Sequence, residues 1–229
     1  MSNKPMKVGD QKAIEAKMSR RKRSAEFVSP LPPRTMIFCE GTKTEPHYLR
    51  EIVTLINEKH REFAMGNRIE LSDVIKIKGA RRSTTSLLKY AIDNVIAGTS
   101  NVWLVYDHDD FPPEQFNETP KMAAARSKNG SIQYHAAWSN ECFELWLLLH
   151  FISLEANISR AEYMKKLKKW IPGYDKSDTN IYSQLKDRVD TAIANAKLIE
   201  SKYDKNSTPS DMAPCTTIYK LVEELLRYI

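Results

Sequence analysis

The chain has 229 residues, of which 41% are hydrophobic and 28% are charged, and its formal net charge is +6. This composition excludes a collagen, a low-complexity tether and a disulfide-dense scaffold. The sequence has no run of roughly 18 apolar residues that would span a bilayer, and no apolar signal segment follows its basic N-terminus. The dispersed cysteines Cys39, Cys142 and Cys215 favour buried thiols in a reducing cytoplasm.

The positive charge is concentrated at the start of the chain. Residues 1–25 hold eight basic and two acidic side chains, and the remainder holds 27 of each sign. The three prolines of Ser29–Pro33 are typical of a linker. We therefore predict a disordered basic arm over 1–33, which either contacts nucleic acid or is a solvated terminus without a partner. A catalytic domain is expected over 34–157, and a helical extension over 158–229.

After the arm, short apolar runs alternate with amphipathic stretches. The runs predict strands over 35–39, 74–77, 102–106 and 131–137. Helical spacing predicts helices over 45–61, 84–96 and 117–128, and an almost wholly apolar helix capped by Asn140. Alternating strands and helices predict an α/β fold with an open, mainly parallel sheet flanked by helices. Beyond residue 159 we expect no strand, and helices over 182–203 and 218–229.

Acidic residues follow two of the predicted strands. Glu40 comes after the first strand and Asp107 after the third, and the carboxyl ends of parallel strands meet where ligands bind. Carboxylates with water and phosphate are the usual ligands of Mg²⁺, and Mn²⁺ takes similar ones. In an extended chain, Asp109 would point the same way as Asp107. The alternative is that these acids only solvate loops and cap helices.

Three motifs resemble the RloB-like family of abortive-infection proteins. They are MIFCEGTKTEPHYL, VWLVYDHDDFP and WSNECFELWLLLHF, and the resemblance extends from Arg34 to the C-terminus. One departure is Glu141, where the family's run has proline; we expect it in the first turn of a helix. The resemblance implies a Toprim fold, in which Glu40, Asp107 and Asp109 would hold Mg²⁺ or Mn²⁺. It also implies an antiviral nuclease that works beside an ATPase partner, with RNA, including tRNA, favoured over DNA.

Each further candidate for a functional role could also be an ordinary structural or surface residue. Glu45 is a second catalytic acid or only a favourable charge at a helix N-terminus. Lys43 and Arg81 would contact the scissile phosphate, or are ordinary surface residues. Other substrate contacts are a basic patch and two polar residues after the fourth strand, which could also be caps: Lys76, Lys78, Arg82, Ser139 and Asn140.

Glu144 falls on an apolar helix face and is therefore expected to be buried. A buried carboxylate needs a partner, so Glu144 would face the metal or pair with a cation such as Lys176. The favoured function is a metal-dependent endonuclease without membrane attachment, and self-association is left open. The first rival is a non-catalytic nucleic-acid-binding or regulatory subunit of an ATPase complex. A weaker rival is a primase-like nucleotidyl transferase.

Overall fold

A computed structural model of the chain describes residues 30–109, 112–154 and 156–229. The chain divides into two compact units, Met1–Leu31 and Pro32–Ile229, and the fold below is that of the second unit. The predicted basic arm therefore lies almost wholly outside the described residues. Within the described part, no helix combines the length and apolarity needed to cross a membrane.

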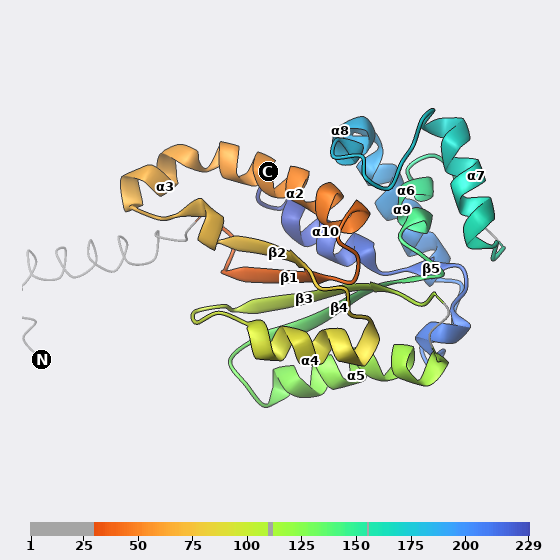
Figure 1. The fold of residues 1–229 in the computed structure, drawn as a ribbon, viewed down its shortest axis with the longest axis horizontal. Coiled ribbons are helices and arrows are strands. Elements are labelled where there is room, and N and C mark those ends of the chain that lie inside the picture. The colour runs from red at the N-terminus through yellow and green to blue at the C-terminus, as the bar shows by residue number, and fades with distance from the viewer. Residues whose placement is uncertain (1–29, 110–111, 155) are drawn as a thin grey trace, which may run out of the picture. The chain divides into compact units, whose positions relative to one another are not determined.

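A five-stranded sheet forms the centre of the second unit (Figure 1). Its strands are β1 Thr35–Cys39, β2 Ile75–Gly79, β3 Asn101–Asp107, β4 Gln133–Asn140 and β5 Cys215–Thr216. They lie in the order β2-β1-β3-β4-β5; the first four are parallel, and β5 is antiparallel to β4. All of β3 after Asn101 is buried, as expected for a strand covered on both faces. The predicted mainly parallel α/β sheet is confirmed.

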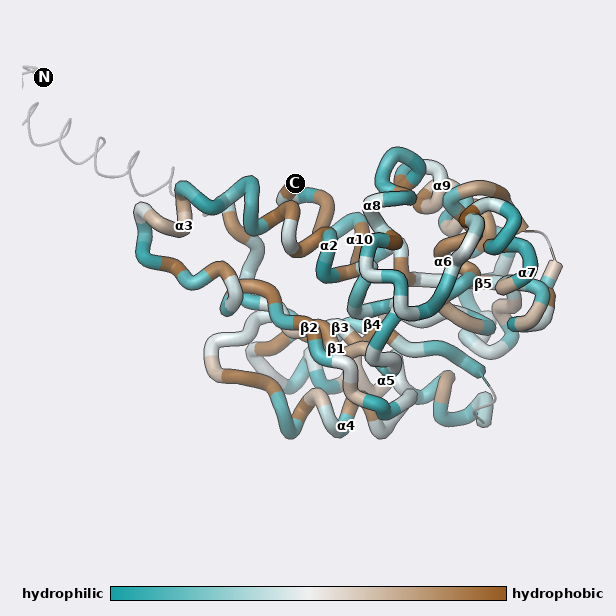
Figure 2. The backbone as a smooth tube through the Cα atoms, turned by 45° about the horizontal axis from the view of Figure 1, so that its top comes forward, coloured by the Kyte–Doolittle hydropathy of each residue, from teal (hydrophilic) through white to brown (hydrophobic). Residues whose placement is uncertain are grey.

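Helices cover both faces of this sheet. On one face lie α2 (Thr44–Lys59) and α10 (Ile218–Leu226), whereas α4 (Thr84–Asn94) and α5 (Pro113–Lys128) lie on the other (Figure 1). A short helix, α3 (Arg61–Asn67), follows α2. Hydrophilic and hydrophobic residues alternate along α2 and α4 (Figure 2), because each helix turns one side towards the sheet.

Four further helices follow β4 in the chain. They are α6 Glu144–Leu149, α7 Arg160–Trp170, α8 Ile181–Leu185 and α9 Val189–Glu200. One of them, α8, packs against α2. Every side chain of α6 is buried, and α6 packs against both α7 and α9. This confirms the prediction of a buried apolar helix. Short 3₁₀ turns occupy Leu71–Asp73, Lys186–Arg188 and Pro209–Asp211.

Two predictions near the end of β4 are wrong. The helix expected directly after Asn140 begins only at Glu144, because β4 continues through Asn140 and Glu141 lies in the connection. A strand also exists beyond residue 159, because β5 pairs with β4. There the Thr217 amide donates to the Trp138 carbonyl at 2.8 Å. A strand of two residues has no alternation that a sequence pattern could reveal.

The helix predicted over 182–203 is interrupted. It consists of α8, a 3₁₀ turn and α9, and the buried residues Leu185 and Val189 lie on either side of that turn. Their spacing is compatible with a continuous helix, so the break leaves no signature in the apolar pattern. The division of the chain at residues 157 and 158 stays a prediction.

Candidate active site

The carboxyl ends of β1 and β3 bring two acidic side chains together. Glu40 directly follows β1, Asp107 ends β3, and the two strands are neighbours in the sheet. The Asp107 amide donates a hydrogen bond to Glu40 Oε2 at 3.1 Å, and the Ser83 hydroxyl donates to the same oxygen at 3.1 Å. The chain leaves β1 towards β2 on one side, while β3 lies on the other, so this is the switch point at which open α/β sheets bind ligands.

Asp107 is held in place by the start of the α6 segment. The Phe143 amide donates to Asp107 Oδ2 at 3.1 Å, and only 8% of Asp107 is exposed. Asp109 is the other carboxylate that we predicted at this strand end, but an extended backbone does not determine its position. The strand ends at Asp107, and Asp109 has a left-handed backbone with φ of 44°, so the argument from extended alternation is wrong.

Asp109 nevertheless faces the same site and has a cation as its partner. The Asp109 amide donates to the Glu141 carbonyl at 3.2 Å, and its Oδ1 forms an ion pair with Nη2 of Arg160. The sequence reasoning missed Arg160. The spacing of Ser159 and Glu162 is a capping-box pattern that predicts a helix starting there, and Ser159 does cap α7. That pattern reveals the helix but not the carboxylate that its first residue contacts.

Two further acids lie beside this pair. Glu45 is in the first turn of α2 and is 8% exposed. A Cβ at Gly41 would lie 2.5 Å from Glu45 Oε2, so the loop after β1 approaches this carboxylate as closely as glycine allows. Glu144, 2% exposed, pairs with Lys176 at 2.7 Å between Oε1 and Nζ. Of the two alternatives for Glu144, the structure therefore has the lysine pair.

Burial and mutual repulsion make these carboxyls unusually basic. Burial raises the pKa of Asp107 well above its usual range, and three nearby carboxylates raise it further: Glu45, Glu144 and Glu40. Burial also raises the pKa of Glu40, although the Asp107 amide and the Ser83 hydroxyl oppose the shift. The pKa of Glu45 is raised by burial and by the Glu144 carboxylate. A cation bound among these groups would relieve the repulsion.

The acids line one cavity together with basic and hydroxyl groups. Its volume is about 320 Å³, and its lining is Glu40, Gly41, Thr42, Lys43, Thr44, Glu45, Asp107, Asp109, Arg160 and Lys176. Lys43, predicted to contact phosphate, is an exposed residue of this lining. Glu144 is not part of this lining, but its partner Lys176 is, and the Glu144 charge acts on Asp107 and Glu45. The cavity therefore combines carboxylates on its floor with three cations around it.

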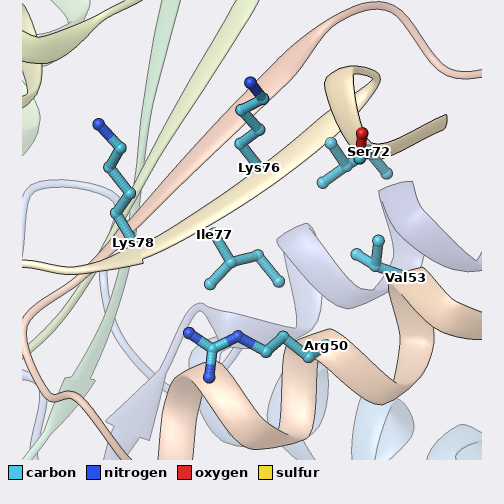
Figure 3. Close-up of a pocket in the computed structure, with 7 residues that line it drawn as sticks. Arg50, Val53, Ser72, Lys76, Ile77 and Lys78 are labelled. Carbon is cyan, nitrogen blue, oxygen red and sulfur yellow. The ribbon is translucent and has the colours of Figure 1, made fainter. Parts of the chain in front are cut away.

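The predicted basic patch divides into two places. Lys76 and Lys78 line a separate cavity of about 430 Å³ between β2 and α2, and Lys76 pairs with Asp73 at 2.8 Å. Figure 3 shows both lysines extending away from α2, whereas Ile77 and Arg50 turn towards the space between strand and helix. These lysines do not line the acidic cavity.

The arginines after β2 begin closer to the acids. The Arg81 amide donates to the Glu40 carbonyl at 3.0 Å, which attaches the chain after β2 to the acidic site. Arg81 and Arg82 are both exposed, and neither is part of the cavity lining. The structure thus brings the backbone of Arg81 to the site, but not its guanidinium.

Ser139 and Asn140 have partners within the protein. Ser139 is fully buried, and its hydroxyl lies 3.0 Å from that of Thr216 on β5. The Asn140 amide group donates to the carbonyls of Pro209 and Ser210 at 3.1 and 3.0 Å. These two side chains secure the end of β4, and neither lines the acidic cavity.

The donor set fits a divalent cation that needs few protein ligands. Within the described residues, no group of three or more histidine, cysteine, aspartate or glutamate side chains is arranged to hold a metal by itself. Mg²⁺ usually takes one or two carboxylates and completes its shell with water and phosphate. Glu40 and Asp107 supply such a pair, because within the described residues neither accepts a hydrogen bond from a lysine or arginine side chain. The three cysteines are buried free thiols, and none of them is part of the cavity lining.

The fold and this site define the class of protein: an α/β protein with an open sheet and clustered carboxylates at its switch point. The model of the RloB-like protein family matches residues 35–225. The chain therefore belongs to the RloB-like family, as its motifs suggested. No curated protein sequence matched the chain.

Proposed function

We propose that this protein is a metal-dependent endonuclease that hydrolyses phosphodiester bonds in the acidic cavity. The observation that carries the proposal is the pair of neighbouring carboxylates, Glu40 and Asp107, at the switch point of the sheet. They share a cavity with Lys43, Arg160 and Lys176. Carboxylates alone would repel a phosphodiester, and cations alone would only bind one. Their combination suits the binding of both a metal and a phosphate.

Each residue has a distinct part in this proposal. Glu40 and Asp107 would hold Mg²⁺ or Mn²⁺, which when bound supplies charge neutralisation at the phosphate and lowers the pKa of a water nucleophile. Ser83 and the Asp107 amide orient the Glu40 carboxylate. The Phe143 amide orients Asp107. Rigid carboxylates of this kind need little rearrangement to receive a cation.

The remaining charged groups act around the substrate. Lys43 is exposed at the cavity and would bind a phosphate oxygen. Arg160 holds Asp109, so a phosphate entering the cavity would compete with Asp109 for the guanidinium. Glu45 lies buried beside the pair and would accept a proton, since its pKa is raised.

We propose the substrate and the setting from the resemblance to the family. The resemblance favours RNA, including tRNA, over DNA, and an antiviral abortive-infection role beside an ATPase partner in the cytoplasm. The membership of the chain in the RloB-like family supports this part of the proposal.

A second candidate is a non-catalytic subunit that binds nucleic acid or regulates an ATPase. The observation that favours it is that two of the acids already have cations, since Arg160 pairs with Asp109 and Lys176 with Glu144. In such a protein the acidic cluster would be a structural ion-pair network. Neutralising Glu40 and Asp107 would then leave the function intact.

One experiment separates the two candidates. The purified protein is incubated with total tRNA, single-stranded RNA and duplex DNA in Mg²⁺, Mn²⁺ or EDTA. The matched variants are Asp107→Asn and Glu118→Gln, which removes an exposed acid on α5. We expect cleavage that needs the metal, survives in E118Q and disappears in D107N while that variant stays folded. If D107N binds the metal as the wild type does, the catalytic proposal is wrong.

A further inference from the structure

The end of α7 exposes a stacked aromatic pair. Trp170 is the last residue of the helix and is 48% exposed. Its ring lies nearly parallel to that of Phe151, with 5.1 Å between ring centroids and 13° between the planes. The guanidinium carbon of Arg188 lies 5.3 Å from the centroid of the Phe151 ring. Phe151 thus supports Trp170 from one side, while about half of the tryptophan surface remains in contact with solvent.

This exposure sets Trp170 apart from the other tryptophans. All four lie in the described part of the chain, and Trp103, Trp138 and Trp146 are at most 8% exposed. Tryptophan carries a large apolar surface, which usually stabilises a fold by being buried. A tryptophan that is held flat and left half exposed is typical of a surface that binds something planar.

The surroundings of Trp170 are strongly basic. Helix α7 carries five basic residues against one acidic residue. Lys165 pairs with Glu162 at 3.8 Å. Hydrogen bonds from Ser177 lower the pKa of Asp175, and Lys168 adds a smaller contribution in the same direction. The helix has two more lysines, Lys166 and Lys169. Lys166 lies one turn before Trp170, and Lys169 directly precedes it. Within the described residues, neither of them forms an ion pair. They are therefore available to an anionic ligand near the exposed ring.

We propose that Trp170, Phe151 and Arg188 form a stacking platform for a base of single-stranded nucleic acid. Lys166 and Lys169 bind the adjoining phosphates. Every base has a planar face that can stack on an aromatic ring, and stacking combined with basic side chains is how single strands bind without sequence preference. In a duplex those faces are already stacked on neighbouring pairs. An acidic peptide could satisfy the lysines, but its acidic side chains carry no aromatic face to stack on the tryptophan.

The platform and the acidic cavity lie at opposite ends of α6. Glu144, the first residue of α6, pairs with Lys176 of the cavity lining, and Phe151 comes seven residues after Glu144. From Glu144 to Leu149 the helix rises about 7.5 Å at 1.5 Å per residue, and Phe151 follows two residues after its end. The inference rests on the proposed function in one respect: the nucleic-acid strand that binds the platform is taken to be the strand that is cleaved in the acidic cavity. The platform consequently favours single-stranded substrates.

Binding can be measured without cleavage. The full-length protein in EDTA is titrated into a labelled unstructured RNA, the DNA of the same sequence, and the corresponding duplex, with fluorescence anisotropy as the readout. The variants are Trp170→Ala, and Trp170→Phe, which keeps a stacking ring. The matched control is Met65→Ala, because Met65 is an apolar residue of α3 with 75% exposure. A double variant, Lys166→Gln with Lys169→Gln, tests the phosphate contacts.

We expect W170A to weaken single-strand binding by roughly tenfold to a hundredfold. The change in log Kd caused by W170F should be less than about a third of the change caused by W170A. M65A should bind as the wild type does. The lysine variant should reduce the salt dependence of binding, whereas W170A should leave it unchanged. Comparable RNA and DNA affinities would mean that the platform reads bases and not the sugar.

The inference is overturned if W170A binds single strands as tightly as the wild type does. It is also overturned if the duplex binds as well as single strands, or if no oligonucleotide binds. If W170A is not folded by circular dichroism, Arg188→Gln takes its place with the same expected direction. Because the titration contains no metal, its failure leaves the cleavage proposal untouched, and loss of cleavage in D107N leaves the binding result untouched.

Discussion

Replacing Lys176 with methionine would leave the buried Glu144 carboxylate without its cation. Glu144 is 2% exposed and its Oε1 lies 2.7 Å from Lys176 Nζ, whereas the lysine side chain is 47% exposed. Removing one partner of a fully buried pair costs about 3–5 kcal/mol. Water already screens the exposed lysine, so we expect a smaller loss, about 2–3 kcal/mol. At about 2–4 °C per kcal/mol, the melting temperature should fall by about 4–12 °C.

The reverse change should be much milder. Glu144→Gln leaves a half-exposed lysine that water can solvate, and it removes one of the charges that repel Asp107. We therefore expect E144Q to change the stability by less than about 1 kcal/mol, and the double variant to resemble E144Q. Thermal unfolding of the wild type, both single variants and the double variant measures this asymmetry. Equal losses of stability in K176M and E144Q would refute the reasoning. They would mean that a buried Glu144 carboxylate without its lysine costs no more than an exposed Lys176 without its acid.

Four further predictions concern the cavity, the loops beside it and the helix α3. Asp107→Asn should raise the melting temperature, and by more at about pH 8 than at about pH 5. The pKa of Asp107 is higher in the folded than in the unfolded chain, so the wild type loses stability as the pH rises through it, and the variant does not. Mg²⁺ at tenfold its dissociation constant should stabilise the wild type by about 1.4 kcal/mol and D107N not at all, as unfolding with and without the metal would reveal. Gly79→Ala should lower the free energy of unfolding by about 1–3 kcal/mol, since its Cβ would meet backbone atoms: the Gly41 carbonyl at 2.7 Å and the Thr42 Cα at 2.8 Å. Gly66→Ala, whose Cβ would meet nothing within 4 Å, should instead stabilise α3 by about 0.5–1 kcal/mol. Unfolding of both glycine variants in urea measures these two changes.

Much of the fold could be predicted because its elements are locally encoded. The apolar run of residues 102–106 indicated a strand covered on both faces, and β3 is the central strand of the sheet. The proximity of Glu40 and Asp107 also followed from local information. Parallel strands with crossover helices must end at the same edge, so residues that follow neighbouring strands meet there. The acidic pair was therefore within reach of sequence reasoning.

The rest of the site could not be predicted in this way. Arg160 looks like any solvated residue at the start of a helix, and only the packing of α7 brings it to Asp109. Strand β5 is too short to show a pattern, yet it secures the end of β4 through Thr216. Trp170 follows a run of lysines in the sequence, and nothing there says that it stacks on Phe151.

By itself, the sequence determined the four parallel strands, most of the helices between them and the residue types that stand at the strand ends. The periodicity of apolar residues and the polypeptide geometry are local properties. They can therefore be read from the sequence without knowing which residues meet in the folded chain. Only the tertiary structure decided which charges are compensated. In the described part of the chain, Asp109 and Glu144 form ion pairs with cations from segments that are remote in sequence, whereas Glu40 and Asp107 form none. Electrostatic energy depends on distance and burial, and both are properties of the packed chain.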